Sequence, residues 1–125
     1  MKSIINTSKA PAPIGPYNQA VKAGNTLYIS GQIPLSVISG ELIIDDIVAE
    51  TKLVMDNIGF ILEEAGYGFQ DVVKTTIFLS DMDLFADVNQ VYGEYFSEQA
   101  PARETVAVKT LPKNVRVEIS AIAFK

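Results

Sequence analysis

The sequence predicts an α+β domain in which a β-sheet carries two helices on one of its faces. Apolar residues recur at helical spacing in two segments, which follow Asp45 and Ser80. The other regular segments alternate apolar and polar residues or are rich in β-branched residues, as strands are. Their order is strand, strand, helix, strand, helix, strand, strand, which is typical of this class. With 125 residues, the chain is expected to form one domain, residues 1–125.

The N-terminal region joins a short apolar segment to an irregular one. Ser3–Ile5 can form a short strand. Three prolines follow, Pro11, Pro13 and Pro16. Because proline fixes φ and lacks a backbone donor, this segment is irregular, and its rigidity orients Tyr17.

A hairpin is predicted next. Ala20–Lys22 and Thr26–Ser30 flank Ala23-Gly24-Asn25, where glycine and asparagine suit positive φ. Residues 31–40 contain Gly, Pro and Ser and predict a loop. Glu41–Ile44 is then expected to form a short strand.

The first helix is expected to begin at Asp45 or Asp46, either of which can cap it, and to end at Gly66. Its apolar positions are Ile47, Val54, Ile58, Ile61 and Ala65. The strand Asp71–Leu79 follows, and Ser80–Asp83 caps the second helix. The apolar stripe of that helix runs through Phe85, Val88, Tyr92 and Phe96. Pro101 marks the return to extended chain.

The last quarter of the chain places two charged residues, Arg103 and Glu118, in strand-like alternation. Glu118 shares one face of its segment with Arg116 and Ser120, opposite an apolar face. If Leu111–Asn114 were a four-residue hairpin loop, the two segments would pair directly, and Arg103 and Glu118 would share one face. Each charge then lies either on a solvated face or in a pocket, because burying it unpaired is costly.

Composition excludes several classes of chemistry. The chain has no Cys and no His, which removes disulfides, thiol nucleophiles and the Ser-His pair, so proton transfer must use Glu, Asp, Tyr or Lys. A net charge of −5 opposes nucleic-acid binding. A hydrophobic share of 48% favours oligomerisation. No signal peptide or membrane-spanning run is visible, so a cytoplasmic location is expected.

Several motifs together resemble the RidA-like reactive intermediate deaminase family. They are Ile14-Gly15-Pro16-Tyr17, Ser30-Gly31-Gln32-Ile33-Pro34, Asp71–Thr76, Val88-Asn89, Tyr95-Phe96, Pro101-Ala102-Arg103 and Val117–Ala123. The resemblance implies a mixed sheet backed by two helices, similar to Bacillus-type chorismate mutase, and a homotrimer with clefts between subunits. It also implies that the two C-terminal strands flank the Asp71–Leu79 strand and do not pair with each other.

The resemblance further implies hydrolytic deamination of enamines and imines such as 2-aminoacrylate and 2-aminocrotonate, without metal or cofactor. Arg103 matches the carboxylate-binding arginine, whose planar fork suits a carboxylate. Glu118 matches the glutamate that positions or activates water. The remaining substrate-binding positions are implied at Tyr17, from a neighbouring subunit, and at Ser30, Gly31, Asn89 and Thr105. Thr105 stands where many relatives have Cys.

Two other functions stay open from the sequence. A sensor of small molecules such as 2-oxo acids would need the carboxylate anchor but no water-activating glutamate. A ribonuclease is opposed by the acidic charge and the lack of His. The expected partners are therefore an imine, enamine or 2-oxo acid and further copies of the chain, with no nucleic acid and no membrane.

Overall fold

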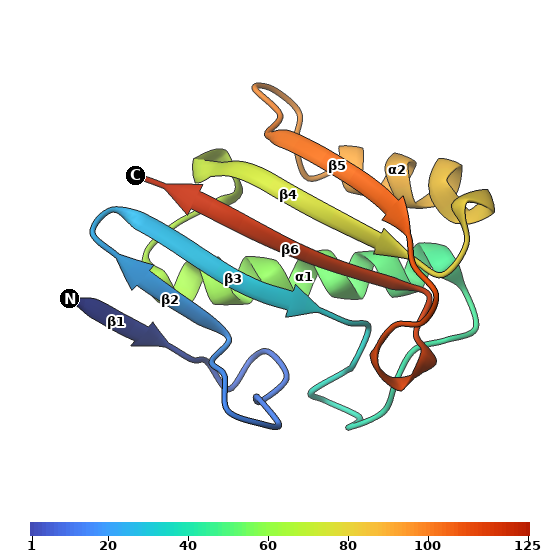
Figure 1. Cartoon of the computed structure of the whole chain (residues 1–125), viewed down its shortest axis with the longest axis horizontal. Coiled ribbons are helices and arrows are strands. Elements are labelled where there is room, and N and C mark those ends of the chain that lie inside the picture. The colour runs from blue at the N-terminus through green and yellow to red at the C-terminus, as the bar shows by residue number, and fades with distance from the viewer.

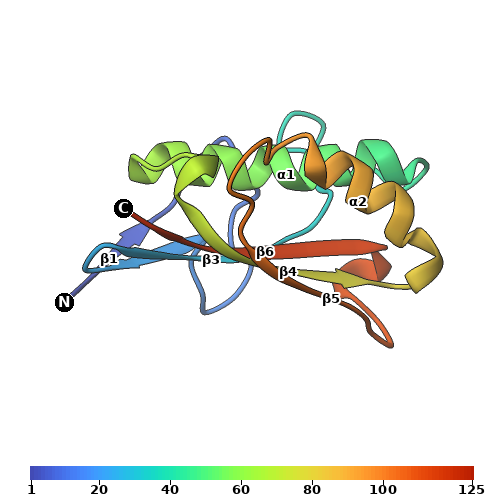
Figure 2. The same cartoon turned by 90° about the horizontal axis from the view of Figure 1, so that it is seen from above.

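The computed structural model describes residues 1–125 as one six-stranded sheet with two helices on one face (Figures 1 and 2). In chain order, the strands and helices are β1 (Lys2–Ile5), β2 (Ala20–Ala23), β3 (Thr26–Gln32), α1 (Ile47–Ala65), β4 (Val72–Leu79), α2 (Phe85–Gly93), β5 (Ala102–Ala107) and β6 (Val117–Phe124). The strand order across the sheet is β1-β2-β3-β6-β4-β5. Only β4 and β5 pair in parallel, so the sheet is mixed and the predicted fold class is confirmed.

Helix α1 begins and ends as its sequence predicts. The Asp46 side chain accepts a hydrogen bond from the backbone N–H of Val48, and Gly66 ends the helix with a φ of 81°. The buried face of α1 packs on the sheet through Val54, Met55, Ile58, Ile61 and Leu62. Neither helix is long and apolar enough to cross a membrane.

Two local predictions need correction. Helix α2 ends at Gly93, before the predicted end of its apolar stripe at Phe96. Phe96 still packs inward, with its ring 5.6 Å from that of Phe69 and 4.9 Å from that of Tyr92. Glu41–Ile44 forms no strand, because its only ladder contact is an isolated bridge between Leu35 and Leu42.

The C-terminal hairpin predicted from the loop length is wrong. β6 pairs antiparallel with β4, whereas β5 pairs parallel with the other edge of β4. The two C-terminal strands therefore flank β4, as the family resemblance implied. Leu111–Asn114 contains the turn Pro112–Asn114 of a connection between separated strands, which loop length alone cannot distinguish from a hairpin.

This topology places Arg103 and Glu118 on opposite faces of the sheet. Arg103 is opposite Thr75 in β4, and Thr75 is buried beneath the helices. Glu118 is opposite Phe78, whose side chain points to the other face because strand residues alternate. The prediction that the two charges share one face is therefore wrong. The face of each residue is set by the register of its strand with β4, which the sequences of β5 and β6 alone do not give.

Candidate active site

Arg103 is held on the helix face of the sheet by three residues of α2. Its Nη1 donates to Asn89 Oδ1 over 2.7 Å. The guanidinium carbon lies 5.5 Å from the Phe85 ring centroid and 5.0 Å from that of Tyr92. The other guanidinium donors have no partner in the structure, and the residue is exposed. This geometry suits binding of a planar anion, because the fork is oriented but still free to donate.

Thr105 lies next to Arg103 on the same face of β5. Its hydroxyl oxygen is buried and has no hydrogen-bond partner. A buried polar atom without a partner is uncommon and costly, so this hydroxyl is available to bond to a further group. Arg103, Asn89 and Thr105 together are termed the Arg103 half-site.

Glu118 occupies a second cluster on the outer face of the sheet. It lines a cavity of about 330 Å³ together with Tyr17, Ser30 and Gly31. The carboxyl group lies directly over Gly31, where a β-carbon would be 2.8 Å from Glu118 Cδ. Gly31 therefore provides the space that the carboxylate fills. These four residues are termed the Glu118 half-site.

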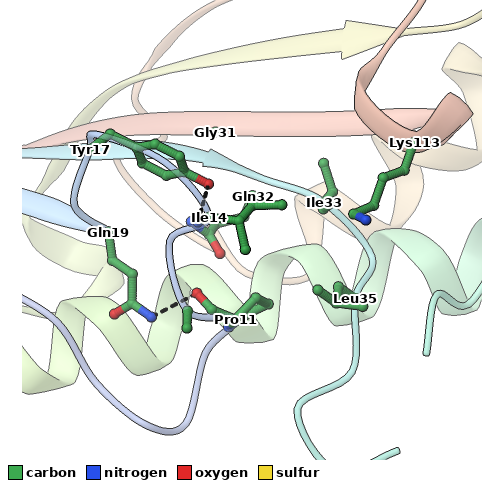
Figure 3. Close-up of a pocket in the computed structure, with 10 residues that line it drawn as sticks. Pro11, Ile14, Tyr17, Gln19, Gly31, Gln32, Ile33, Leu35 and Lys113 are labelled. Carbon is green, nitrogen blue, oxygen red and sulfur yellow. Dashed lines mark hydrogen bonds between the residues drawn. The ribbon is translucent and has the colours of Figure 1, made fainter. Parts of the chain in front are cut away.

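Tyr17 reaches this cavity from the proline-rich segment, as its predicted rigidity suggested. Gly15, with a φ of 150°, starts a tight turn in which the Tyr17 N–H donates to the Gly15 carbonyl over 2.9 Å. The Ile14 N–H faces the Tyr17 hydroxyl at 3.5 Å (Figure 3). The Tyr17 side chain is half exposed, so it is free to contact a ligand.

The environment of Glu118 changes its acidity. Burial raises the pKa of this carboxyl above its ordinary value, because the charged form loses hydration. A carboxyl with a raised pKa, located in a cavity, is a stronger base than an ordinary carboxylate and is suited to take a proton from water. The Ser30 hydroxyl, by contrast, donates to the Asn18 carbonyl over 2.7 Å and has a structural partner.

Some lining residues were missed by sequence reasoning. Ile14, Ile33 and Lys113 also line the Glu118 cavity. Figure 3 shows Lys113 beside Ile33. Lys113 lies in the turn Pro112–Asn114, and no local pattern in the sequence connects it to Tyr17 or Gly31. The ring contacts of Phe85 and Tyr92 with Arg103 were also missed, since both residues fit the apolar stripe of a helix.

The predicted site residues thus form two half-sites on opposite faces of the sheet within one chain. The face covered by the helices carries Arg103, Asn89 and Thr105. The opposite face carries Glu118 and Ser30, with Tyr17 beside them in the same cavity. Within a single chain, Tyr17 belongs with Glu118.

The sequence and the fold both match one known family. A family model described as Endoribonuclease L-PSP matches residues 7–125. The chain belongs to this family. A RutC family protein of Pyrococcus horikoshii is 54% identical over 125 residues, covering 100% of this chain and 99% of the relative.

Other relatives connect the family to RidA. The mouse protein named 2-iminobutanoate/2-iminopropanoate deaminase is 49% identical over 125 residues, covering 100% of this chain and 93% of the relative. A RidA structure from an Antarctic Psychrobacter superimposes with a TM-score of 0.94 at 44% identity, covering 98% of this chain and 99% of that one. The predicted RidA-like membership is confirmed.

Proposed function

We propose that this protein hydrolyses reactive enamines and imines, such as 2-aminoacrylate, 2-aminocrotonate and their imine tautomers, to 2-oxo acids and ammonia. The observation that carries the proposal is the free guanidinium fork of Arg103. It is oriented by Asn89 and two aromatic rings yet keeps its remaining donors for a ligand. All of these substrates carry a carboxylate that this fork can bind by two parallel charge-assisted hydrogen bonds.

The complete site would form between two subunits. Because the two half-sites lie on opposite faces of the sheet, one chain cannot bring Arg103 and Glu118 to the same small substrate. In a ring of identical subunits, the Arg103 half-site of one chain can face the Glu118 half-site of the next. This arrangement is supported by the orphaned Thr105 hydroxyl, which needs a partner from outside its own chain or from a ligand.

The outer face of the sheet supports assembly, and we propose a homotrimer. No helix covers this face (Figure 2). It nevertheless carries large apolar side chains that are about half exposed, namely Tyr28, Val106 and Phe124. Such apolar surface is typical of subunit interfaces. Light scattering coupled to gel filtration should report three times the 13.6 kDa mass of one chain; a monomer at micromolar concentration would contradict both the trimer and the shared site.

The reaction needs only water and a correctly placed base. An enamine first takes a proton on carbon and loses one from nitrogen, which converts it to an imine. Glu118 accepts a proton from water as the oxygen bonds to the imine carbon, and the nitrogen gains a proton. The amine of this adduct then takes up a second proton while the hydroxyl group loses its own, the carbon–nitrogen bond breaks, and ammonia and the 2-oxo acid are released. No electrons are gained or lost, so no redox partner is required.

The other residues have supporting roles in this proposal. Arg103 holds the substrate carboxylate while Thr105 offers its hydroxyl beside it. Tyr17 covers the Glu118 side of the substrate, where Gly31 and Ser30 present backbone groups. A half-buried Glu118 is also a stronger base than an ordinary carboxylate, because burial raises its pKa.

The deciding experiment measures 2-oxo acid and ammonia release from an imine generated in situ by a dehydratase, with and without this protein. We expect faster release when the protein is present, after correction for spontaneous hydrolysis. Glu63→Gln is a suitable control, because Glu63 is an exposed carboxylate on the outer side of α1. No acceleration, combined with calorimetric binding of 2-oxobutyrate, would instead indicate a sensor of 2-oxo acids.

A further inference from the structure

Glu50 is a fully buried carboxylate that the proposed reaction does not use. It lies on α1 and is 0% exposed. One carboxylate oxygen accepts from Arg116 Nε over 3.2 Å, and the other accepts from Arg116 Nη2. A buried ion pair is a weak source of stability, since apolar residues of similar volume often serve as well. The two hydrogen bonds of this pair do, however, fix the orientation of the Arg116 side chain.

Arg116 connects this pair to the Glu118 half-site. It precedes Val117, the first residue of β6, and therefore lies two positions before Glu118. Its carbonyl accepts from the Ser80 N–H over 3.0 Å, just after β4 ends. The side chain of Arg116 is thus tied to α1 while its backbone is tied to the sheet. This corrects the prediction that Arg116 shares the face of Glu118.

The turn before Arg116 has an unfavourable backbone conformation. Lys113 and Asn114 both have a φ of 56°, a left-handed conformation that non-glycine residues adopt at a cost. Lys113 also lines the Glu118 cavity. A firm attachment at Arg116 therefore separates a strained turn from the strand that carries Glu118.

Asn57, on the same helix, anchors the opposite wall of this region. It is 1% exposed, and its Nδ2 donates to the carbonyls of Ile33 and Leu35 over 3.4 and 3.2 Å. Ile33 lines the same cavity as Glu118. Helix α1 consequently holds two of the three chain segments that border this cavity through buried polar side chains.

We infer that Glu50 is a positioning residue for Glu118: by binding Arg116 in two-pronged fashion, it fixes the start of β6 so that the Glu118 carboxyl stays over Gly31. This inference rests on the proposed role of Glu118. It adds that the reaction requires Glu50, a residue on the helix face of the sheet that does not contact the substrate. Asp45 and Asp46 also lie near the Arg116 guanidinium but do not bond to it, so Glu50 alone sets its direction.

Two variants test the inference. Glu50→Leu/Arg116→Met replaces the pair by apolar side chains and leaves no buried charge unpaired. Arg116→Lys keeps the charge opposite Glu50 but removes the fork, and it carries the test if the double variant does not fold. Glu63→Gln is the matched control, because it removes a carboxylate of α1 whose ion pair with Lys9 is exposed.

We expect the kcat of the double variant to fall roughly tenfold to a hundredfold, and that of Arg116→Lys by a smaller factor. Binding of 2-oxobutyrate should stay within about twofold of the parent, because Arg103 lies on another strand. Glu63→Gln should match the parent. The inference would be overturned if the folded variants kept the kcat of the parent. It would also be overturned if 2-oxobutyrate binding were lost together with kcat, because that would indicate a general loosening of the structure.

A titration independent of turnover separates this inference from the proposed function. Carbon-13 NMR of the side-chain carboxyls follows Glu118 directly, with Lys113 the other charged group that lines its cavity. In both variants the pKa of Glu118 should fall toward its ordinary value as the carboxyl leaves its half-buried position. If the parent protein has no deaminase activity, the proposed function fails. An unchanged Glu118 titration in the variants would then still overturn the positioning role.

Discussion

The Glu118 carboxyl lies over Gly31, in space that the side chain of any other residue would occupy. A β-carbon on Gly31 would be 2.8 Å from Glu118 Cδ and 3.0 Å from Cγ. The φ of Gly31 is not in the positive region, so the backbone itself would accept alanine. The need for glycine therefore comes from the carboxyl group alone.

Gly31→Ala is expected to displace Glu118 without unfolding the protein. The carboxyl end of a flexible side chain can move away, so the free energy of unfolding should change by less than about 1 kcal/mol. The displaced base should lower kcat by roughly tenfold or more. Gly93→Ala is the control, because a β-carbon there meets no atom within 4 Å. Parent kcat in Gly31→Ala would show that the position of the carboxyl is unimportant.

Glu118→Gln should separate catalysis from binding. Glutamine keeps the size of the side chain but cannot take a proton from water. We expect kcat to fall by about 10²- to 10⁴-fold, while calorimetry with 2-oxobutyrate still shows binding through Arg103. Initial rates must be corrected for spontaneous imine hydrolysis. If turnover persists with normal product affinity, Glu118 is not the base.

The acidity of Glu118 also predicts a pH dependence. Burial raises its pKa in the folded state, so the parent kcat should rise as pH increases through that raised pKa, and Glu118→Gln should lose this limb. A raised carboxyl pKa stabilises the fold at low pH, and this contribution is lost as pH rises through the folded-state pKa. The free energy of unfolding in urea should therefore be higher for Glu118→Gln than for the parent, and this difference should be larger at about pH 7 than at about pH 4.

Arg103→Lys should impair recognition of the carboxylate. Lysine keeps the positive charge but cannot form two parallel hydrogen bonds, and it has no planar guanidinium to contact the Phe85 and Tyr92 rings. We expect kcat/KM on 2-iminobutyrate to fall more than tenfold, about 1.4 kcal/mol or more. Lys52→Arg, elsewhere on the surface of α1, should be neutral. An unchanged kcat/KM would mean that Arg103 is not the anchor.

Mixed oligomers should reveal a site shared between subunits. Arg103→Ala and Glu118→Gln should each be nearly inactive alone. Coexpressed in equal amounts, they should regain about a quarter of the parent activity, because about one site in four then combines an intact Arg103 with an intact Glu118. The hybrids can be isolated with two different affinity tags. No recovery in such hybrids would place both residues in the same chain's site.

We also predict that the protein does not bind RNA usefully at physiological salt. The net charge is −5, and binding of a phosphate backbone depends on clustered Lys and Arg. Gel retardation of a single-stranded RNA over a series of salt concentrations measures this directly. A clear, salt-sensitive shift with purified protein would reverse the conclusion and favour a nuclease.

Much of the fold follows from local sequence. Asp46 and Gly66 bound α1 as predicted, because capping depends on neighbouring residues along the chain. Gly24, with a φ of 60°, allows the turn between β2 and β3. The alternation of β6 also places Val117 and Ile119 in the core, as expected. The lack of His and Cys limits the possible chemistry through composition alone, because no arrangement of the chain can supply an imidazole or a thiol.

The arrangement of the site depends on tertiary structure. Period-two alternation says which residues of one strand share a face, but it does not relate the faces of two strands until their neighbours are known. The insertion of β4 between β5 and β6 therefore decided that Arg103 and Glu118 lie on opposite faces. The same long-range contacts brought Lys113 beside Ile33 and joined Glu50 to Arg116, since these pairs are far apart in sequence. Local sequence patterns do not predict such contacts, because the two residues of each pair come together only when the sheet has folded.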